Sequence, residues 1–308
     1  MKRDSVVAID LGSNTFRGVE MDCKTLEPIA LYEKIVKTAD GLHESGKIGD
    51  EAIERIIEAA DEAKRVLNFG KPIVAVTTEA VRRASNAKDV IDRIKRETGI
   101  EFRTISGDVE ASLTLLAVKK RLEKIGFKGE RFVMVDIGGG STEILFFDNG
   151  DFESRSFKVG IVTVAQKYKS LEKIEQEMPN LTLQMREFVE EKMLQKRPQL
   201  FVATAGTPTT VAAMKLGLTY RSYDAGKVNG TVVEKSDLKI QLKRLLDLDH
   251  KSRQELVGVG REDLIAAGIL IYEAIFSILG FDESIVVDDG LREGVAIAAC
   301  SGDLKEFL

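Results

Sequence analysis

The sequence predicts two α/β domains that arose by duplication and face each other across a cleft. One phrase occurs twice: residues 6–15 (VVAIDLGSNT) and residues 133–141 (VMVDIGGGS) both run from apolar residues through an aspartate into a small, polar turn. A repeat at this distance indicates a duplicated domain, because solenoid repeats recur every 20–50 residues or so. Each copy opens a series of three expected strands followed by alternating helices and strands, which favours an antiparallel meander continued by parallel strands.

In the first half, the strand signals precede the helix signals. Apolar residues at helical spacing within 50–68 place one face of that helix in a core. The expected elements are strands 5–11, 16–22 and 28–36, helix 50–68, strand 72–78, helices 79–84 and 87–98, strand 101–106 and helix 108–124.

The second half repeats this order with an insertion. The expected elements are strands 131–137, 142–148 and 152–159, a helical region 161–196, strand 199–205, helix 208–216, a strand near 228–234, helices 236–247 and 262–279, strand 284–288 and helix 291–307. We therefore predict an N-terminal domain, 1–125, and a C-terminal domain, 126–308, whose final helix could pack back on the first domain.

Composition excludes several classes of protein. The 308 residues are 44% hydrophobic and 31% charged, as in a globular protein, and the net charge of −5 gives no reason to expect binding to DNA or to a membrane surface. No apolar run approaches the roughly 18 residues of a membrane-spanning helix. Residues 1–4 lead directly into a strand without a signal segment, so we expect a cytoplasmic location.

The rare residue types narrow the chemistry further. Cys23 and Cys300 are too few and too isolated for a disulfide framework or a thiolate metal site, so we expect both to be buried bystanders. The chain has only two histidines, His43 and His250, which are far apart in the sequence, so a histidine-rich metal centre is excluded. Carboxylates, hydroxyls, arginines and backbone groups remain.

The glycine-rich turn at 138–140 is the strongest candidate for a binding loop. Consecutive glycines let the backbone turn sharply and present several N–H groups to one point, which is how peptide dipoles hold an anion. Asp136 and Glu143 flank this turn and could hold a metal ion or orient a water. The earlier copy, residues 12–15 after Asp10, predicts a second loop of the same kind.

Features that favour anions recur at other strand ends. Arg17 follows the first turn and could meet phosphate oxygens in fork geometry. Helix starts attract anions through free N–H groups and the helix dipole. Arg82 lies near one such start, and Gly206 and Thr207 form another. The strand-to-helix segments concerned are 77–84, 203–210 and 288–294.

Segment 105–111 also passes from a strand into a helix. Glu110 would lie in the first helical turn, where the dipole favours its ionised form, as suits a base. Ordinary structural explanations remain for every segment: hairpin turns, capping threonines with solvated arginines, and the general preference of acids for first turns. All of them lie where ligands of open α/β sheets bind, at the carboxyl ends of strands, and this shared location favours function.

The order of five of these segments resembles the exopolyphosphatase/guanosine pentaphosphate phosphohydrolase (Ppx/GppA) family over nearly the whole chain. The segments are residues 10–14 (DLGSN), 78–84 (TEAVRRA), 105–111 (ISGDVEA), 136–143 (DIGGGSTE) and 290–294 (GLREG). The resemblance implies α/β architecture with duplicated ribonuclease-H-like (actin/hexokinase/Hsp70-like) domains. It also implies hydrolysis of a terminal phosphoanhydride, with Mg²⁺ or Mn²⁺ as the expected ion.

The resemblance assigns roles to individual positions. Glu110 matches the catalytic base, and Asp136 and Glu143 match acids that position water and metal; we add Asp10 as a third candidate metal ligand. The candidate phosphate-binding residues are Gly12, Ser13, Asn14, Thr15, Arg17, Arg82, Gly138, Gly139, Gly140, Ser141, Gly206, Thr207 and Arg261.

The chain departs from the family pattern at several places. Val109 replaces the first of two adjacent acids, although Glu110 is kept. Ala205 stands where glycine is common, which would tighten that loop, and Asn229 stands where histidine is frequent. The sequence also ends after the second domain, without the helical C-terminal region of longer members.

The expected function is release of the terminal phosphate of polyphosphate or guanosine pentaphosphate by water that Glu110 activates. A small-molecule kinase of the same superfold would need an acceptor pocket that the sequence does not locate. A non-catalytic, nucleotide-binding actin-like protein would not need Glu110. The preferred substrate and chain length, the direct metal ligands, the source of specificity and the oligomeric state, a homodimer included, do not follow from the sequence.

Overall fold

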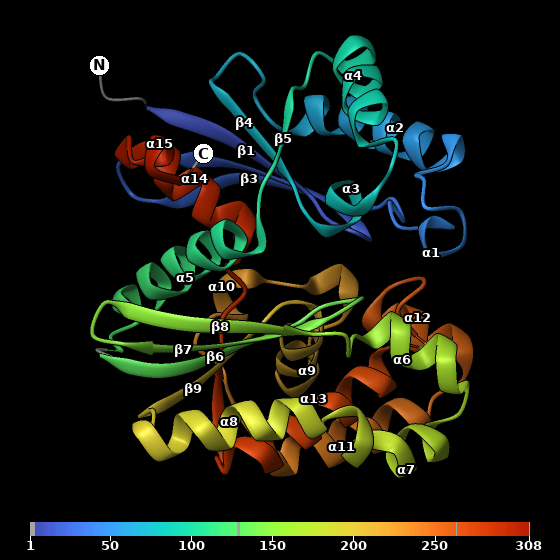
Figure 1. Ribbon diagram of the computed structural model, residues 1–308, viewed down its shortest axis with the longest axis vertical. Coiled ribbons are helices and arrows are strands. Elements are labelled where there is room, and N and C mark those ends of the chain that lie inside the picture. The colour runs from blue at the N-terminus through green and yellow to red at the C-terminus, as the bar shows by residue number, and fades with distance from the viewer. Residues whose placement is uncertain (1–3, 128–129, 263, 308) are drawn as a thin grey trace. The chain divides into compact units, whose positions relative to one another are not determined.

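The computed structural model describes residues 4–127, 130–262 and 264–307, which form two compact units (Figure 1). Unit 1 comprises Met1–Lys120 with Asp289–Leu308, and unit 2 comprises Arg121–Asp288. The boundary between the units therefore lies inside helix α5 (Gly107–Lys124), whereas the sequence analysis expected it after residue 125. The last helices belong to unit 1, so this unit is built from both ends of the chain.

Unit 1 contains a five-stranded mixed sheet in the order β3-β2-β1-β4-β5. The first three strands pair antiparallel, and β4 and β5 extend the sheet in parallel. The strands are β1 (Ser5–Leu11), β2 (Thr15–Asp22), β3 (Glu27–Ile35), β4 (Ile73–Thr77) and β5 (Phe102–Thr104).

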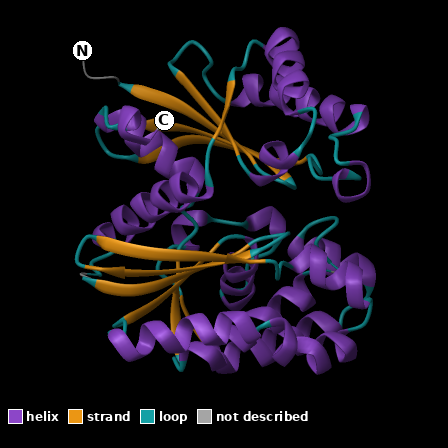
Figure 2. Cartoon of the chain, viewed as in Figure 1, coloured by secondary structure: helices purple, strands orange, loops and turns teal. Residues whose placement is uncertain are grey.

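Both faces of this sheet are covered by helices because β1 is apolar on both sides (Figure 2). Val7 and Ile9 join a core with helices α2 and α4, whereas Val6 and Ala8 join a second core with α5 and α14. The helices of unit 1 are α1 (Leu42–Ser45), α2 (Asp50–Val66), α3 (Glu79–Arg83), α4 (Ala87–Thr98), α5, α14 (Leu291–Ser301) and α15 (Leu304–Phe307).

The expectation for the two cysteines was wrong. Cys23, just after β2, and Cys300, in α14, form a disulfide with their Cα atoms 5.1 Å apart. Both half-cystines pack against the core shared by β1, α5 and α14. A separation of 277 residues hid this pairing, because only the return of the chain to unit 1 brings the two thiols together.

Unit 2 repeats the mixed sheet with one strand added at its edge, in the order β10-β11-β9-β6-β7-β8. Strands β6, β7 and β8 form the antiparallel meander, and β9 and β11 pair in parallel. The strands are β6 (Arg131–Ile137), β7 (Thr142–Asp148), β8 (Asp151–Phe157), β9 (Leu200–Thr204), β10 (Val232–Glu234) and β11 (Glu283–Val286). The two units thus share the duplicated ribonuclease-H-like α/β fold.

The helices of unit 2 build its main core on one sheet face, where Phe188, Phe201 and Phe276 are fully buried. They are α6 (Ile161–Tyr168), α7 (Leu171–Leu181), α8 (Leu183–Gln195), α9 (Gly206–Lys215), the 3₁₀ helix η1 (Tyr220–Ser222), α10 (Ala225–Val228), α11 (Lys235–Leu246), α12 (His250–Val257) and α13 (Ile265–Leu279). No helix among the described residues is long and apolar enough to cross a membrane.

Capping explains where these helices differ from expectation. The region 161–196 is divided into three helices. Lys169 adopts a left-handed conformation (φ 57°) and the Ser170 hydroxyl then caps α7, while Thr182 ends α7 and precedes α8. Asp224 caps the short α10, which shortens the strand expected near 228–234. Helix α12 was not expected, and α13 begins after residue 263, which lies outside the described residues.

Candidate active site

The glycine-rich turn of unit 2 is held by the start of α6. The carbonyl oxygens of Gly138 and Gly139 accept hydrogen bonds from the N–H groups of Ile161 (3.1 Å) and Val162 (2.8 Å). In a trans peptide, C=O and N–H point in opposite directions. The N–H groups of Gly139 and Gly140 therefore face away from α6, and neither has a partner among the described residues. This arrangement suits the binding of an anion.

Gly160 makes this support possible, and the sequence analysis missed it. A Cβ at Gly160 would lie 2.4 Å from the carbonyl oxygen of Gly139 and 2.5 Å from the Ser141 nitrogen. No residue with a side chain fits there without moving the turn. The sequence signal for Gly160 was a glycine between the third expected strand of the second half and a helix, and a glycine at such a position also fits an ordinary loop.

The corresponding turn of unit 1 is held in the same way. The carbonyl of Ser13 accepts from Ala39 N–H (2.8 Å), and the carbonyl of Asn14 accepts from the N–H groups of Val36 and Lys37 (both 2.9 Å). The chain that follows the third strand thus binds the carbonyl side of the turn in both units. The Asn14 N–H shares its peptide with the Ser13 carbonyl and so points away from this support.

Three charged residues form a row across the meander of unit 1. Asp10 on β1 lies opposite Arg17 on β2, which lies opposite Glu33 on β3. Residues in such register present their side chains on one face of the sheet. The Arg17 Nε atom lies 3.4 Å from a Glu33 carboxylate oxygen. Arg17 is therefore held by an acid of its own unit.

Asp10 is a poorly satisfied carboxylate. Its Oδ1 atom is buried and has no hydrogen-bond partner among the described residues. Burial raises the pKa of Asp10 to about 6, although the positive charges of Arg17 and Arg292 act to lower it. A buried carboxylate without a partner is costly when ionised, so this site favours a proton or a cation.

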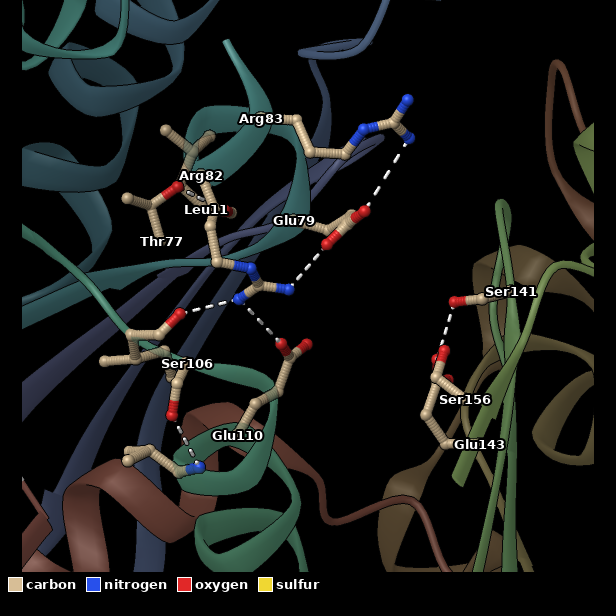
Figure 3. A network of polar contacts seen from close by, with 12 residues as sticks. Leu11, Thr77, Glu79, Arg82, Arg83, Ser106, Glu110, Ser141, Glu143 and Ser156 are labelled. Carbon is tan, nitrogen blue, oxygen red and sulfur yellow. Dashed lines mark hydrogen bonds and ion pairs between the residues drawn. The ribbon is translucent and has the colours of Figure 1, made fainter. Parts of the chain in front are cut away.

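The meander of unit 2 carries a row with different chemistry. Asp136 on β6 lies opposite Glu143 on β7, which lies opposite Ser156 on β8. The Glu143 Oε1 atom accepts hydrogen bonds from the hydroxyls of Ser141 and Ser156, each at 2.6 Å (Figure 3). Two carboxylates therefore lie next to each other on one face, and one is held by two hydroxyl donors. The sequence analysis did not select Ser156.

Glu110 lies in the first turn of α5, as expected. Ser106 caps this helix, its hydroxyl accepting from the Val109 N–H at 3.3 Å. The Glu110 carboxylate lies 3.8 Å from Arg82 Nη1, and its side chain is 35% exposed (Figure 3). Arg82 also donates to the Ile105 carbonyl (2.6 Å) and to Glu79 (2.6 Å). The Arg82 guanidinium is thus held by contacts within unit 1, and one of these contacts is to Glu110.

A second helix start repeats the spacing of Glu110 but not its surroundings. Gly107 precedes Glu110 by the same interval by which Gly290 precedes Glu293 at the start of α14. Glu293 accepts from the Gly290 N–H (2.9 Å) and from Arg292 Nε (2.5 Å), and its side chain is only 5% exposed. Glu293 is a buried cap, so Glu110 is the one of the two that water can reach.

The sequence of this chain is similar to that of a known protein family. The sequence profile of the Ppx/GppA phosphatase family matches residues 19–301. This chain belongs to that family. Exopolyphosphatase 2 from Mycobacterium tuberculosis (strain H37Rv) is 28% identical over 317 residues, which span 95% of this chain and 98% of that protein.

Solved structures agree with the Ppx/GppA assignment. The crystal structure of the Ppx/GppA family member from Aquifex aeolicus superposes with a TM-score of 0.74 at 30% identity, covering 98% of both chains. An exopolyphosphatase from Cytophaga hutchinsonii gives a TM-score of 0.80 at 22% identity over 97% of this chain and 98% of that chain. The second likeness supports the fold alone.

The predicted phosphate-binding residues Gly206 and Thr207 of this Ppx/GppA member lie in unit 2. Ala205, at the start of α9, has φ 70° and ψ −170°, a conformation that normally needs glycine. Thr207 is fully buried, and its Oγ1 atom lies 2.4 Å from where a Cβ of Gly268 on α13 would be. The Thr207 side chain therefore packs against α13, and its part in phosphate binding stays a prediction.

Arg261 lies beside an exposed aromatic ring. Its guanidinium is 6.0 Å from the centroid of Tyr220, a residue that is 55% exposed. Gly258 lets the loop approach this ring, since a Cβ there would be 2.8 Å from it. Asn229, where the family often has histidine, accepts from the Asp288 N–H at 2.8 Å. Asn229 thus holds the end of the segment that follows β11.

The candidate metal ligands are carboxylates, which are donors that Mg²⁺ prefers. The described residues contain no group of three or more His, Cys, Asp or Glu side chains arranged to hold a metal ion. Asp10 has a buried, unpartnered oxygen, and Asp136 and Glu143 lie opposite each other. Mg²⁺ usually takes one or two carboxylates and keeps several waters, so the Asp136–Glu143 pair of unit 2 fits it, and Asp10 of unit 1 offers a separate carboxylate of the same kind.

Proposed function

We propose that this protein releases the terminal phosphate of inorganic polyphosphate or guanosine pentaphosphate by hydrolysis of a phosphoanhydride. Its membership of the Ppx/GppA phosphatase family supports the reaction class. The observation that carries the proposal is the repeated turn, whose carbonyls are bonded to the following chain so that N–H groups remain for an anion. Polyphosphate as the substrate rests on relatives named exopolyphosphatases.

Glu110 is the proposed general base. It is partly exposed, lies in a first helical turn and is 3.8 Å from Arg82 Nη1, so its carboxylate is oriented by a neighbouring guanidinium. It would accept a proton as water attacks the terminal phosphorus. Phosphoryl transfer depends on positioning and charge neutralisation more than on covalent chemistry, so the turns and Arg17 supply the rest.

Mg²⁺, or Mn²⁺ in its place, is the proposed metal ion, and the candidate ligands are Asp136 and Glu143 in unit 2 or Asp10 in unit 1, each acting directly or through water. Bound there, the ion would neutralise the charge that develops on the phosphate oxygens. When no cation is present, the negative charges of these carboxylates repel the negatively charged substrate and oppose its binding.

Phosphate release from long-chain polyphosphate, tripolyphosphate and guanosine pentaphosphate, compared as kcat/KM, tests the proposal. We expect release from at least one of them, its loss in EDTA and its return with Mg²⁺ or Mn²⁺. Transfer from ATP to an added acceptor without hydrolysis of these substrates would favour a kinase instead. Full activity in metal-free protein would remove the metal from the proposal.

The proposed setting of the reaction also needs a test. A cytoplasmic location and a homodimer both stay predictions. The Cys23–Cys300 disulfide stands against the first, because thiols are kept reduced in most cytosols. Fractionation of cells with thiol-trapping reagents gives the location and redox state together, and light scattering gives the mass of the assembly.

A further inference from the structure

We propose that Ser156 is a positioning residue that fixes the Glu143 carboxylate for cation binding, an inference that rests on the proposed function of the same site. Ser156 lies on β8, the edge strand of the unit 2 sheet, opposite Glu143. Its hydroxyl donates to Glu143 Oε1 at 2.6 Å. No other bond of Ser156 ties this hydroxyl within the described part of the chain.

Two hydroxyls restrict the Glu143 carboxylate more than one hydroxyl would. Ser141 reaches Glu143 Oε1 from the glycine-rich turn, and Ser156 reaches the same atom from the neighbouring strand (Figure 3). A glutamate has three rotatable bonds, and its terminal torsion is broad. Two donors, one from the turn and one from β8, converge on Oε1 and restrict this torsion. The other carboxylate oxygen of Glu143, Oε2, therefore keeps a fixed direction. Such donors orient metal-binding carboxylates in many proteins.

Unit 1 offers independent support for a supporting role at this position. The residue at the matching place on its third strand is Glu33, which forms an ion pair with Arg17, the middle residue of that row. In both units the third strand thus contributes a side chain whose partner is the middle residue. The chemistry of the support changes with the middle residue: an acid supports arginine, and a hydroxyl supports glutamate.

A double-mutant cycle on the full chain separates positioning from simple structural support. The variants are Ser156→Ala, Ser156→Thr, Glu143→Ala and the double variant Ser156→Ala/Glu143→Ala. Ser154→Ala is the matched control, because Ser154 lies on the same strand but opposite Leu145. The readouts are Mn²⁺ binding to substrate-free protein by electron paramagnetic resonance, and the Mg²⁺ concentration for half-maximal phosphate release alongside KM for substrate.

We expect Ser156→Ala to weaken Mn²⁺ binding about 10-fold or more, within the range known for residues that orient metal ligands. KM for substrate should change less than the Mg²⁺ requirement. Ser156→Thr keeps the hydroxyl and should restore binding, and Ser154→Ala should match the unchanged protein. In the Glu143→Ala background, Ser156→Ala should have no further effect, since the two residues act as one unit.

Two results would overturn the inference: Mn²⁺ binding that Ser156→Ala leaves within about twofold of the unchanged protein, or an equal loss with and without Glu143. A protein that binds no Mn²⁺ would overturn it as well. Absence of hydrolysis of every phosphoanhydride substrate would instead reject the proposed function, while the Mn²⁺ cycle would still decide the role of Ser156.

Discussion

The meanders of units 1 and 2 have the same backbone plan but carry different charges. In unit 1 the row across the three strands is Asp10, Arg17 and Glu33. In unit 2 the equivalent row is Asp136, Glu143 and Ser156. The middle residue is a cation in unit 1 and an anion in unit 2, and we propose that Arg17 meets phosphate oxygens whereas Asp136 and Glu143 hold a metal ion.

This difference teaches that a duplicated backbone can be assigned two tasks by changing one row of side chains. The turns, whose proposed binding groups are backbone N–H groups, are held in the same way in both units by hydrogen bonds to their carbonyl oxygens. The rows depend on side chains and have diverged. The role of proton acceptor is the one that we assign to Glu110, whose side chain is 35% exposed.

The largest expected effect therefore concerns Glu110. Replacement by glutamine removes the proton acceptor while keeping shape and hydrogen bonding, so Glu110→Gln should lower kcat by about 10²–10⁴-fold with little change in KM. Steady-state phosphate release measures this. Asp108→Asn is the control, because it removes an exposed acid from the same first turn. Near-normal turnover in Glu110→Gln would remove Glu110 from the mechanism.

The second prediction contrasts the construction of the units. Unit 1 is discontinuous and closed by the Cys23–Cys300 disulfide, whereas unit 2 contains no cysteine. Reduction, or Cys23→Ser with Cys300→Ser, should destabilise unit 1 by about 2–4 kcal/mol. Hydrogen exchange read peptide by peptide should show faster exchange in unit 1 and little change in unit 2. Free thiols in the unreduced native protein would contradict the bond itself.

The third prediction uses the pH dependence of Asp10. Because its folded-state pKa is raised to about 6, its contribution to stability is present below the unfolded pKa and is lost as pH rises through about 6. The total loss is on the order of 3 kcal/mol. Asp10→Asn should remove this decline when unfolding free energies are compared from pH 4 to pH 8 or so. Mg²⁺ should reduce the decline in the unchanged protein, and parallel pH curves for the two proteins would reject the effect.

The fourth prediction tests the division of labour between the rows. Arg17→Ala removes a charged donor and should raise KM about 10- to 100-fold, with the Mg²⁺ requirement little changed. Glu143→Ala should do the reverse. Arg83→Ala is the control, because Arg83 is exposed and pairs only with Glu79 among the ion pairs described. If Arg17→Ala and Glu143→Ala change the same kinetic parameter, the two rows do not have separate tasks.

The smallest expected effect is on stability, and it concerns the residues that directly follow strands β9 and β4. Ala205 follows β9 with φ 70°, whereas Thr78 follows β4 with φ −121°. Ala205→Gly should raise the free energy of unfolding by about 1 kcal/mol, since relief of strain exceeds the added freedom of the unfolded chain. Thr78→Gly, at the equivalent place, should lower it. Denaturant titration measures both, and destabilisation by Ala205→Gly would show that the turn is not strained.

Local patterns predicted most of the fold and part of the site. The order of the strands and helices, the two turns and the position of Glu110 at a helix start all follow from periodicity and turn chemistry over a few residues. Gly160 and Ser156 were missed for a different reason. Each acts on a residue of another strand or turn, and strand register, which local periodicity does not set, brings them there.

The sequence by itself determined the duplication, the α/β class and the residue types able to bind phosphate, because these depend on apolar spacing and on motifs that are continuous in the chain. Only the tertiary structure decided that Cys23 meets Cys300 and that Glu293 is buried while Glu110 is accessible. These outcomes depend on contacts between distant segments. Two helix starts with the same Gly-x-x-Glu spacing acquire different roles because packing, and not local sequence, sets how much water reaches each carboxylate.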